Sequence, residues 1–533
     1  MTWDAIVIGS GFGGAMAAHA LVHAGQRVLM LERGAWVSRS PENWGAQGAG
    51  LVTPHYSMES PYRVRTGDRS FLAGSWHCVG GQSVFYGGAS FRFRMRDFED
   101  EPAITGDSDA AWPFRYADLE PYYARAERLL GVAGEHGTDP TEPSRSSPYP
   151  QEPPPLSGPS RVIADAARRL GLSPFRIPLA INYSSSTERR GCLRCGTCDG
   201  YACAAEAKND VATGILPALM RRGMVLCANT VCVRLLRRGS RIIGAECVDR
   251  ITGQRRREMA RCVVLAAGAL ATPHLLLASN LAMSGPAPHA VGRYLTRHRN
   301  AVVFGLFRRP PNPDGVFDKQ IAIHDFYFGA AGSEAPAGPL GSIQQMTPPL
   351  GMVRAYVPRA VRDPAALLVS YTSGLLVMAE DQPQRRNGVT IDTSAVDRSG
   401  LPLLHVQHCY STRDEAAASA LAVHARGILR EAGALLTWVH PLDTFTHALG
   451  SVRMGPDERT APLDGDGRYR GLDSLYVADG SALPRSAGVN PSLTIAANAL
   501  RIGSEIARSL APAQRYSSRA LPIAEALPLE RVR

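Results

Sequence analysis

The chain has 533 residues, of which 45% are hydrophobic and 20% charged; this composition supports a large apolar core and excludes intrinsically disordered and collagen-like proteins. The 58 basic and 48 acidic residues leave a net charge of +10, and the basic residues are scattered among acids, so we expect no nucleic-acid partner. No apolar run approaches the about 20 residues of a membrane helix, and no secretory signal pattern precedes the first strand-like stretch. We therefore expect a soluble, cytoplasmic protein without an integral membrane segment.

The N-terminal segment predicts a strand, a helix and a second strand. Residues 4–8 form a short apolar run, residues 15–24 repeat small and apolar side chains at helical spacing, and residues 27–32 form another apolar run. This order is typical of a β–α–β unit.

A glycine motif joins the first strand to the helix. Gly9, Gly11 and Gly14 have the Gly-x-Gly-x-x-Gly spacing, in which the helix N-terminus offers amide donors to the pyrophosphate of a dinucleotide. Glu32 ends the second strand, where it can accept a hydrogen bond from a ribose hydroxyl. An intact acid at this position favours FAD or NAD over NADP.

Later elements follow from the same patterns. In chain order we expect helices over residues 116–130 and 161–170, a hairpin of residues 231–236 and 241–248 around Gly239, and a buried strand over 263–273. Short apolar runs such as 301–307 and 367–378 then indicate a sheet, followed by a helix over 413–431, a strand at 475–481 and a helix over 495–510. Strand ends near Gly9, Ala267 and Asp479 imply one nucleotide-binding domain assembled from separated segments.

Taken together, these motifs resemble the glucose–methanol–choline (GMC) family of flavoprotein oxidoreductases over most of the chain. The resemblance is carried by residues 9–14 with Glu32, by the Gly-Gly-Gln-Ser-Val-Phe-Tyr-Gly-Gly stretch at 80–88, and by the segments 268–273, 447–455 and 475–494. The residues of the first glycine motif and an Asn in the last segment resemble the cholesterol-oxidase-like bacterial branch more than the glucose oxidases. The implied fold class is α/β, with a Rossmann-like FAD-binding domain made of discontinuous segments and an α+β substrate domain on an antiparallel sheet.

The resemblance also implies a division of the chain. We expect the FAD-binding domain at 1–100, 200–300 and 441–510, the substrate domain at 101–199 and 301–440, and a C-terminal tail at 511–533.

The implied reaction is the FAD-dependent oxidation of an alcohol to a carbonyl, with hydride passing to flavin N5. In the family, the residues that match His447 and Asn490 lie beside the flavin and hold the substrate hydroxyl. An imidazole, whose ordinary pKa is about 6.5, suits the removal of the hydroxyl proton near neutral pH, and an Asn amide can donate to the substrate oxygen. The expected partners are a small-molecule alcohol and dioxygen or another electron acceptor.

A larger set of residues is expected to contact FAD. Tyr86 stands where the family often has Asn, which departs from the common pattern. Phe85 lies nearest the position at which some relatives carry a histidine bound to the flavin, so we expect non-covalent FAD, with His77 as the alternative attachment point. The expected contacts are Gly9, Gly11, Phe12, Gly14, Glu32, Gly81, Ser83, Gly87, Val231, Ala267, Asp479, Gly480, Asn490, Pro491 and Ser492.

Four cysteines are clustered at Cys192, Cys195, Cys198 and Cys203, a spacing compatible with an iron–sulfur cluster or zinc. Similar segments occur in bacterial GMC relatives that do not generally require a metal. We therefore assign no metal ligand and expect free or cross-linked thiols, with a cluster or zinc as the alternative. A cluster would favour a dehydrogenase over an oxidase.

Two other functions stay open at this point: a lyase with a structural flavin, and a nucleotide-binding module without catalysis. The sequence does not distinguish among sterol, sugar, aliphatic and specialised-metabolite alcohols.

Overall fold

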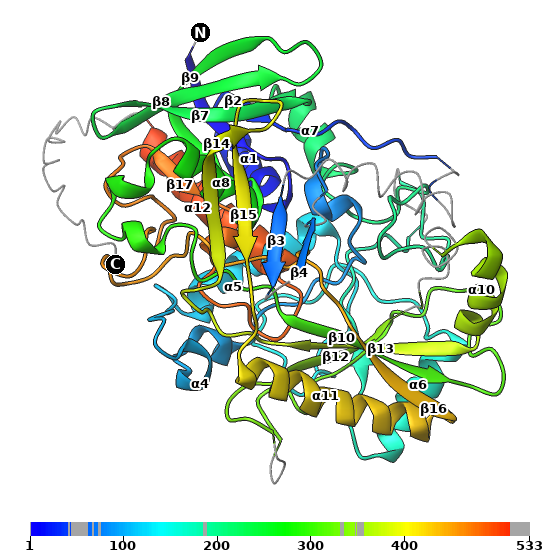
Figure 1. Cartoon of the computed structure of the whole chain (residues 1–533). Helices are drawn as coiled ribbons and strands as arrows, with labels where there is room; N and C mark the ends of the chain where they lie inside the picture. Colours follow the sequence, from blue (N-terminus) through cyan, green and yellow to red (C-terminus); the bar gives the residue numbers. More distant parts are fainter. Residues whose placement is uncertain are drawn as a thin grey trace, which may run out of the picture.

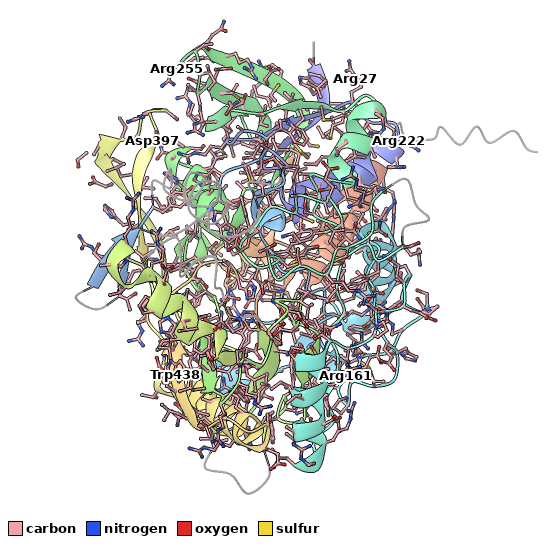
Figure 2. All side chains as sticks on the ribbon, turned by 90° about the vertical axis from the view of Figure 1, so that its right-hand side faces the viewer. Arg27, Arg161, Arg222, Arg255, Asp397 and Trp438 are labelled. Carbon is pink, nitrogen blue, oxygen red and sulfur yellow. The ribbon has the colours of Figure 1, made fainter. Side chains whose placement is uncertain are left out.

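The computed structural model of the chain describes residues 2–40, 43, 62–66, 69–72, 76–184, 189–330, 335–346, 348 and 357–511. The expected tail at 511–533 lies outside the described residues except for residue 511. Within the described part, the strands form sheets of seven, six and four strands (Figure 1). In Figure 2, Arg27 and Arg255 beside the first sheet lie at the opposite end of the molecule from Trp438 of the second sheet.

The seven-stranded sheet is built from distant parts of the chain. Its strands are β1 (Thr2–Ile8), β2 (Val28–Leu31), β6 (Val225–Cys227), β7 (Thr230–Arg238), β8 (Arg241–Asp249), β9 (Arg255–Leu265) and β17 (Leu475–Val477). β1 pairs in parallel with β2 and β9, β6 pairs in parallel with β2, and β17 in parallel with β9. β7 and β8 form the expected hairpin and add an antiparallel extension beyond β9. The central strands are apolar and buried over residues 5–8, 28–31 and 263–265, because both faces of this part of the sheet are covered.

Helix α1 (Phe12–His23) packs between this sheet and helix α12 (Ser492–Leu510). A β-carbon at Gly503 of α12 would lie 2.7 Å from the carbonyl oxygen of Ala17, so glycine is needed for the close helix contact. This packing places the N-termini of both helices at the same end of the sheet's central strands, where the chain leaves β1 and β17.

The six-stranded sheet separates a helical layer from a cavity. It has the order β16 (Leu436–Pro441), β10 (Arg299–Leu306), β13 (Thr372–Ala379), β12 (Gly341–Met346), β11 (Ile321–Ile323), β5 (Phe175–Arg176). Leu375 and Val377 pack against helices α6 (Gly158–Arg169) and α11 (Thr412–Glu431), whereas Leu376 and Met378 line the cavity. This alternation follows from the two-residue period of a strand.

A four-stranded sheet lies between the other two in the view of Figure 1 and has the order β14 (Gly388–Val396), β15 (Pro402–Gln407), β3 (Arg63–Thr66), β4 (Arg69–Leu72). The remaining described α-helices are α4 (Pro102–Thr105), α5 (Tyr116–Leu130), α7 (Ile215–Arg221), α8 (Gly268–Ala278) and α10 (Arg362–Ser370). None of the helices in the described ranges has the length and hydropathy to cross a bilayer.

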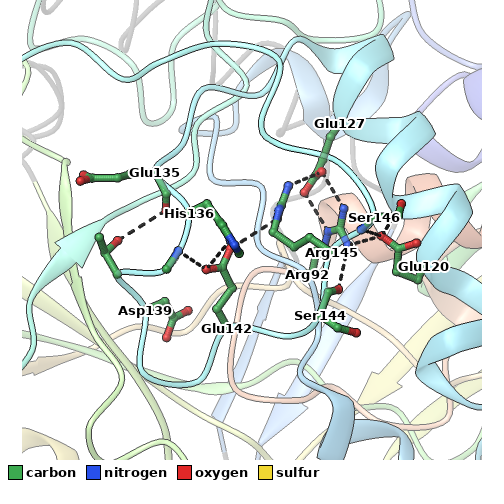
Figure 3. A network of polar contacts seen from close by, with 12 residues as sticks. Arg92, Glu120, Glu127, Glu135, His136, Asp139, Glu142, Ser144, Arg145 and Ser146 are labelled. Carbon is green, nitrogen blue, oxygen red and sulfur yellow. Dashed lines mark hydrogen bonds and ion pairs between the residues drawn. The ribbon is translucent and has the colours of Figure 1, made fainter.

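Helix α5 carries a buried ion network that fixes the loop beside it (Figure 3). The Glu127 carboxylate accepts hydrogen bonds of 2.9 and 2.8 Å from Arg92 and one of 2.6 Å from Arg145. All three side chains are buried, so removal of one would leave the charge of a partner buried and unpaired.

The expected α/β class, with a discontinuous nucleotide-binding sheet and a second antiparallel sheet, is confirmed. The helices expected at 116–130 and 413–431 are also confirmed. The strand expected over 263–273 is wrong beyond Leu265, because the chain turns at Ala266 and Ala267 and enters α8. Likewise, the apolar run at 367–378 is the end of α10 followed by β13, since a short apolar run fits either element.

Candidate active site

One elongated cavity of about 970 Å³ runs from the glycine turn after β1 to the inner face of the six-stranded sheet. Its size lies within the range of small-molecule and cofactor sites. The cavity brings together almost all of the expected site residues, namely Gly9, Gly11, Phe12, Glu32, Gly81, Ser83, Gly87, Val231, Ala267, His447, Asp479, Gly480, Asn490, Pro491 and Ser492.

Gly14 does not line the cavity, although the motif includes it. A β-carbon there would collide with the carbonyl oxygen of Gly9. Gly14 therefore lets α1 pack closely on β1, which is the part of the motif that serves helix–strand contact. A β-carbon at Gly11, by contrast, would meet no atom within 4 Å outside the adjacent residues. Gly11 thus keeps open the space in front of the helix N-terminus.

The carboxylate of Glu32 is buried and bound by the neighbouring backbone. It accepts hydrogen bonds from the Ser10 amide at 3.0 Å, the Ser10 hydroxyl at 2.5 Å and the Gly34 amide at 2.8 Å. The Ser10 hydroxyl in turn accepts a bond from the Gly80 amide at 2.9 Å. This chain of bonds holds the glycine loop at 80–88 against the turn after β1.

Two further polar residues expected to contact FAD also have structural partners. The Ser83 hydroxyl donates to the Gly80 carbonyl at 2.7 Å and accepts from the Val211 amide at 3.2 Å. Asp479 accepts from the Gly268 amide at 2.8 Å and the Thr272 hydroxyl at 2.6 Å, which joins the end of β17 to the start of α8. Burial raises the pKa of Asp479. Both residues therefore shape the cavity wall.

The residues present fit a dinucleotide cofactor. α1 begins at a glycine that has no side chain to cap it, and α12 begins without a side-chain cap, so backbone amides at both helix starts remain for an anionic ligand. Both starts lie at the cavity, where Gly11, Phe12, Pro491 and Ser492 form part of the wall. A pyrophosphate suits the first of these, and the length of the cavity leaves room for a ring system at the other end.

His447 and Asn490 lie next to each other in the cavity wall. His447 Nε2 lies 3.5 Å from Asn490 Nδ2. Burial, together with the neighbouring His298 ring and the charge of Lys319, lowers the pKa of His447 well below 6.5. The imidazole is therefore neutral at pH 7, and a neutral imidazole has one nitrogen that can accept a proton.

Sequence reasoning missed Gln344, which orients the Asn490 amide. Gln344 Nε2 donates to Asn490 Oδ1 at 3.0 Å and to Ser342 Oγ at 3.0 Å. With its oxygen engaged in this way, Asn490 presents its NH₂ group to His447 and the cavity. Gln344 lies on β12, where successive side chains point to opposite faces of the sheet. The sequence alone does not show which of these faces is turned toward Asn490.

His298 was also missed, although its ring contacts His447. The two Nδ1 atoms lie 3.1 Å apart, and the rings meet edge to face with centroids 5.2 Å apart. His298 stands just before β10 and is 1% exposed.

An ion pair closes the wall beside Gly87. Lys319 Nζ lies 3.0 Å from both carboxylate oxygens of Asp199, and both residues line the cavity. A β-carbon at Gly87 would collide with the Asp199 carboxylate, so glycine is required where this pair approaches the loop.

The end of the cavity near the six-stranded sheet mixes apolar and polar side chains. Asn300 is 5% exposed, and its Oδ1 has no hydrogen-bond partner among the described residues. Because Asn300 lines the cavity, this oxygen is available to a ligand hydroxyl or amine. Other residues at this end are Asn312, Phe317, Met346, Thr372, Leu376, Met378, Leu442, Asp443, Thr444 and Thr446.

The four clustered cysteines do not form a ligand set. All are free thiols, and no group of three or more His, Cys, Asp or Glu in the described ranges is placed to hold a metal ion. Cys192 Sγ accepts from the Arg194 amide at 3.3 Å, and Cys195 Sγ lies 3.3 Å from Thr197 Oγ1.

Comparisons with known proteins agree with this arrangement. Residues 3–300 and 383–499 each match a family model described as GMC oxidoreductase. Two relatives are 32% identical over 532 residues: 6'''-hydroxyparomomycin C oxidase of Streptomyces lividus, covering 96% of this chain and 92% of that protein, and paromamine 6'-oxidase of Streptomyces fradiae, covering 95% and 92%. The 2-methyl-1,2-propanediol dehydrogenase of Mycolicibacterium austroafricanum is 28% identical, covering 95% of each chain.

Among solved structures, pyridoxine 4-oxidase from Mesorbium loti has a TM-score of 0.67 at 20% identity, covering 95% of this chain and 99% of that one. This likeness shows the same fold. GMC oxidoreductases bind FAD, which agrees with the glycine turn and the uncapped helix starts in the cavity wall. The matches of the family models over most of the chain show that this protein belongs to the GMC oxidoreductase family.

Proposed function

We propose that the protein oxidises an alcohol to a carbonyl with FAD bound in the elongated cavity, and that His447 is the base. The observation that carries this proposal is the pair formed by a neutral His447 and the Asn490 amide, 3.5 Å apart at the inner end of the cavity. One group can accept a proton, and the other can donate a hydrogen bond to oxygen. An alcohol oxygen placed in the cavity beside the pair would contact both.

The chain's own residues supply binding, orientation and proton removal. FAD, when bound, supplies the acceptor for the hydride that leaves the alcohol carbon. Asn490 Nδ2 donates to the substrate oxygen and holds it in place, because Gln344 has fixed the amide orientation. His447 Nε2 takes the hydroxyl proton, and the electron pair left on oxygen forms the second bond of the carbonyl as hydride departs.

The cofactor contacts proposed are the expected residues that line the cavity, with Gly14 acting through helix packing. The helix starts at Phe12 and Ser492 offer amides to the anionic parts of the cofactor, and Val231 lies at the nucleotide end. We propose that the FAD is held without a covalent bond, since Phe85 occupies the position nearest the attachment site of some relatives. Acid precipitation of the purified protein should leave the yellow colour in the supernatant; colour in the pellet would point to His77.

We propose a hydroxylated amino sugar as the substrate and dioxygen as the electron acceptor. The support is the pair of relatives at 32% identity, which are named oxidases of paromamine and of 6'''-hydroxyparomomycin C. Asn300, with its unpartnered Oδ1, and the threonines at 372, 444 and 446 give the cavity polar groups suited to a substrate with several hydroxyls.

The test is anaerobic reduction of the bound flavin. Paromamine and 2-methyl-1,2-propanediol are mixed with the yellow enzyme, and absorbance is followed before and after dioxygen is admitted. Bleaching by paromamine, with recovery and peroxide formation in dioxygen, supports the proposal. An enzyme that no alcohol bleaches would instead favour a lyase with a structural flavin.

Two variants test the residues. His447→Gln should slow flavin reduction by on the order of 10²-fold or more, because a positioned base contributes about that much. Asn490→Ala should raise the substrate concentration at which flavin reduction is half-maximal, and it should slow the reduction. His424→Gln serves as the control, since this half-buried histidine lies on α11 against Phe326, away from the cavity wall. Unchanged reduction by His447→Gln would remove His447 from the mechanism.

A further inference from the structure

The ring of His298 is held in one orientation by two backbone carbonyls. Its Nε2 lies 3.0 Å from the carbonyl oxygens of both Ser486 and Ala487. Carbonyl oxygens only accept hydrogen bonds, so Nε2 of His298 must carry a hydrogen. In a neutral imidazole the other nitrogen then has a lone pair and no hydrogen.

That other nitrogen, Nδ1 of His298, faces Nδ1 of His447 at 3.1 Å. A hydrogen bond between two ring nitrogens needs one donor and one acceptor. Because Nδ1 of His298 carries no hydrogen, His298 is the acceptor and His447 the donor. We propose that His298 is a positioning residue that holds His447 as the tautomer protonated on Nδ1, so that Nε2 carries no hydrogen and presents its lone pair to the cavity. This inference rests on the proposed function, because it explains why the nitrogen beside Asn490 is the one able to take the substrate proton.

Burial keeps His298 neutral despite two nearby carboxylates. Burial lowers its pKa below the ordinary value of 6.5, and this effect outweighs the opposing charges of Asp381 and Glu380. On the side of His447, the other charge that acts is that of Lys319, which also disfavours a protonated imidazole. A doubly protonated His298 would force His447 Nδ1 to accept and would place the hydrogen of His447 on Nε2, where it would block proton uptake.

The backbone of His298 is anchored for this task. His298 has a φ of +64°, which is uncommon for residues other than glycine, so the neighbouring contacts hold it there. The Asp381 carboxylate accepts from the amides of Arg297 and His298 at 2.8 and 3.0 Å. The Tyr410 hydroxyl donates to the His298 carbonyl at 2.8 Å.

The same Asp381 also fixes the carbonyls that orient the His298 ring. The Ser486 hydroxyl donates to Asp381 Oδ1 at 2.8 Å, so one carboxylate ties His298 to the segment whose carbonyls accept from its ring. Asp381 therefore holds both the backbone of His298 and the segment that orients its ring. This arrangement is expected of a support for a reacting group.

In the reaction the substrate O–H bond breaks and its proton forms a bond to His447 Nε2. His447 then has hydrogens on both nitrogens, and the one on Nδ1 continues to donate to His298. A hydrogen bond from a charged donor is stronger than one from a neutral donor, so His298 stabilises the protonated base as it forms. Loss of the His298 acceptor therefore affects the chemical step more than substrate binding.

The direct test is the tautomer of His447 in the flavin-loaded enzyme. Long-range ¹H–¹⁵N correlation spectra of protein carrying ¹⁵N-labelled histidine distinguish a hydrogen on Nδ1 from one on Nε2, and the His447→Gln variant identifies the signal. We expect a hydrogen on Nδ1. A hydrogen on Nε2 of His447 would overturn the proposal, whatever the activity.

Two substitutions separate positioning from a structural role. His298→Asn places an amide oxygen near the Nδ1 position and suits a positive φ, so it should keep the Nδ1 tautomer and reduce flavin within about tenfold of the wild-type rate. His298→Ala removes the acceptor, so flavin reduction should slow by on the order of 10²-fold with little change in the half-saturating substrate concentration, and the His447 tautomer should become mixed. His324→Ala is the matched control, because it deletes a histidine that is also 1% exposed but lies against Arg94 and Asp139.

The outcomes distinguish this inference from the proposed function. Flavin content and thermal unfolding show whether each variant folds. If His298→Ala does not fold, the positioning role is tested by the His447 tautomer of the unsubstituted enzyme and by the reduction rate of His298→Asn. Slow reduction by His447→Gln with normal reduction by His298→Ala would refute the positioning role and leave His447 as the base. Normal reduction by His447→Gln would refute the base itself.

Discussion

Arg485 and Glu380 form an ion pair in which both side chains are almost completely buried, with distances of 3.1 Å from Nε to Oε1 and 3.2 Å from Nη2 to Oε2. Glu380 Oε1 also accepts from the Ala487 amide at 3.1 Å. The pair therefore fixes the segment that carries the carbonyls facing His298 and leads to Asn490. A site residue thus depends on a charge pair that never reaches the cavity wall.

Removing one partner of this pair should destabilise the protein strongly. Glu380→Ala leaves the Arg485 guanidinium buried without its carboxylate, and such a loss costs about 3–5 kcal/mol. The free energy of unfolding in urea measures the effect. Glu380→Leu combined with Arg485→Met should lose much less, because neither charge of the pair stays buried without its partner.

Asp165→Ala provides the control for an exposed pair. Asp165 and Arg168 are 2.9 Å apart, and their side chains are 58% and 55% exposed, so the change should be within about 1 kcal/mol. Equal stability of Glu380→Ala and Asp165→Ala would mean that the buried pair contributes little.

The rate of flavin reduction should depend on pH in a way set by His447. Because burial holds the pKa of His447 well below 6.5, the base is already neutral at pH 6.5. We expect a constant reduction rate from pH 6.5 upward and a fall only at clearly lower pH. Stopped-flow measurements under anaerobic conditions give this profile, and a midpoint at or above pH 6.5 would contradict a buried, neutral base.

The sequence was sufficient to predict the fold class and the part of the cavity wall at the glycine turn because those features depend on local patterns. Gly9, Gly11 and Glu32 lie within one strand–helix–strand unit, and the hairpin of β7 and β8 has a turn residue between two apolar runs. Such signals need no knowledge of tertiary contacts.

The residues that orient the site could not be predicted in the same way. Gln344 contacts Asn490 across 146 positions, and His298 contacts His447 across 149. Neither has a local motif, and their roles follow from sheet register and from which backbone carbonyls lie nearby. The end of the strand at Leu265 was missed for a related reason: small apolar residues continue into α8 without a change in composition.

Stability should fall in mild acid because of buried histidines such as His274. Burial lowers the pKa of His274 to about 4. Between pH 6.5 and about 4 the unfolded chain protonates this residue while the folded chain does not, so stability falls with falling pH by up to about 1.4 kcal/mol per pH unit from this group.

His274→Gln should flatten this dependence. Gln can still donate to the Pro402 carbonyl, which lies 2.7 Å from His274 Nε2, but it does not titrate. Urea unfolding from pH 7.5 to 4.5 compares the two proteins, and their difference at pH 7.5 gives the cost of the substitution alone. Parallel curves would show that His274 does not keep its lowered pKa.

The glycine motif offers the sharpest separation between packing and binding, because Gly11 and Gly14 lie three residues apart with opposite surroundings. A β-carbon at Gly14 collides with the Gly9 carbonyl, whereas one at Gly11 meets no atom within 4 Å outside the adjacent residues. Gly14→Ala should therefore force α1 away from β1 and lower the free energy of unfolding by about 1–3 kcal/mol, the range for overpacking. Gly11→Ala should fold normally, since its φ of −67° suits alanine.

The flavin content should be affected in Gly11→Ala, the variant that we expect to fold normally. The methyl group of Gly11→Ala enters the space before the α1 N-terminus, where we place the pyrophosphate, so the purified protein should contain less flavin and lose it on gel filtration. Far-ultraviolet circular dichroism and urea unfolding of the flavin-free forms report folding, and absorbance at the flavin band reports binding. Full flavin content in Gly11→Ala would show that the cofactor does not approach the turn after β1, and would require another position for it in the cavity.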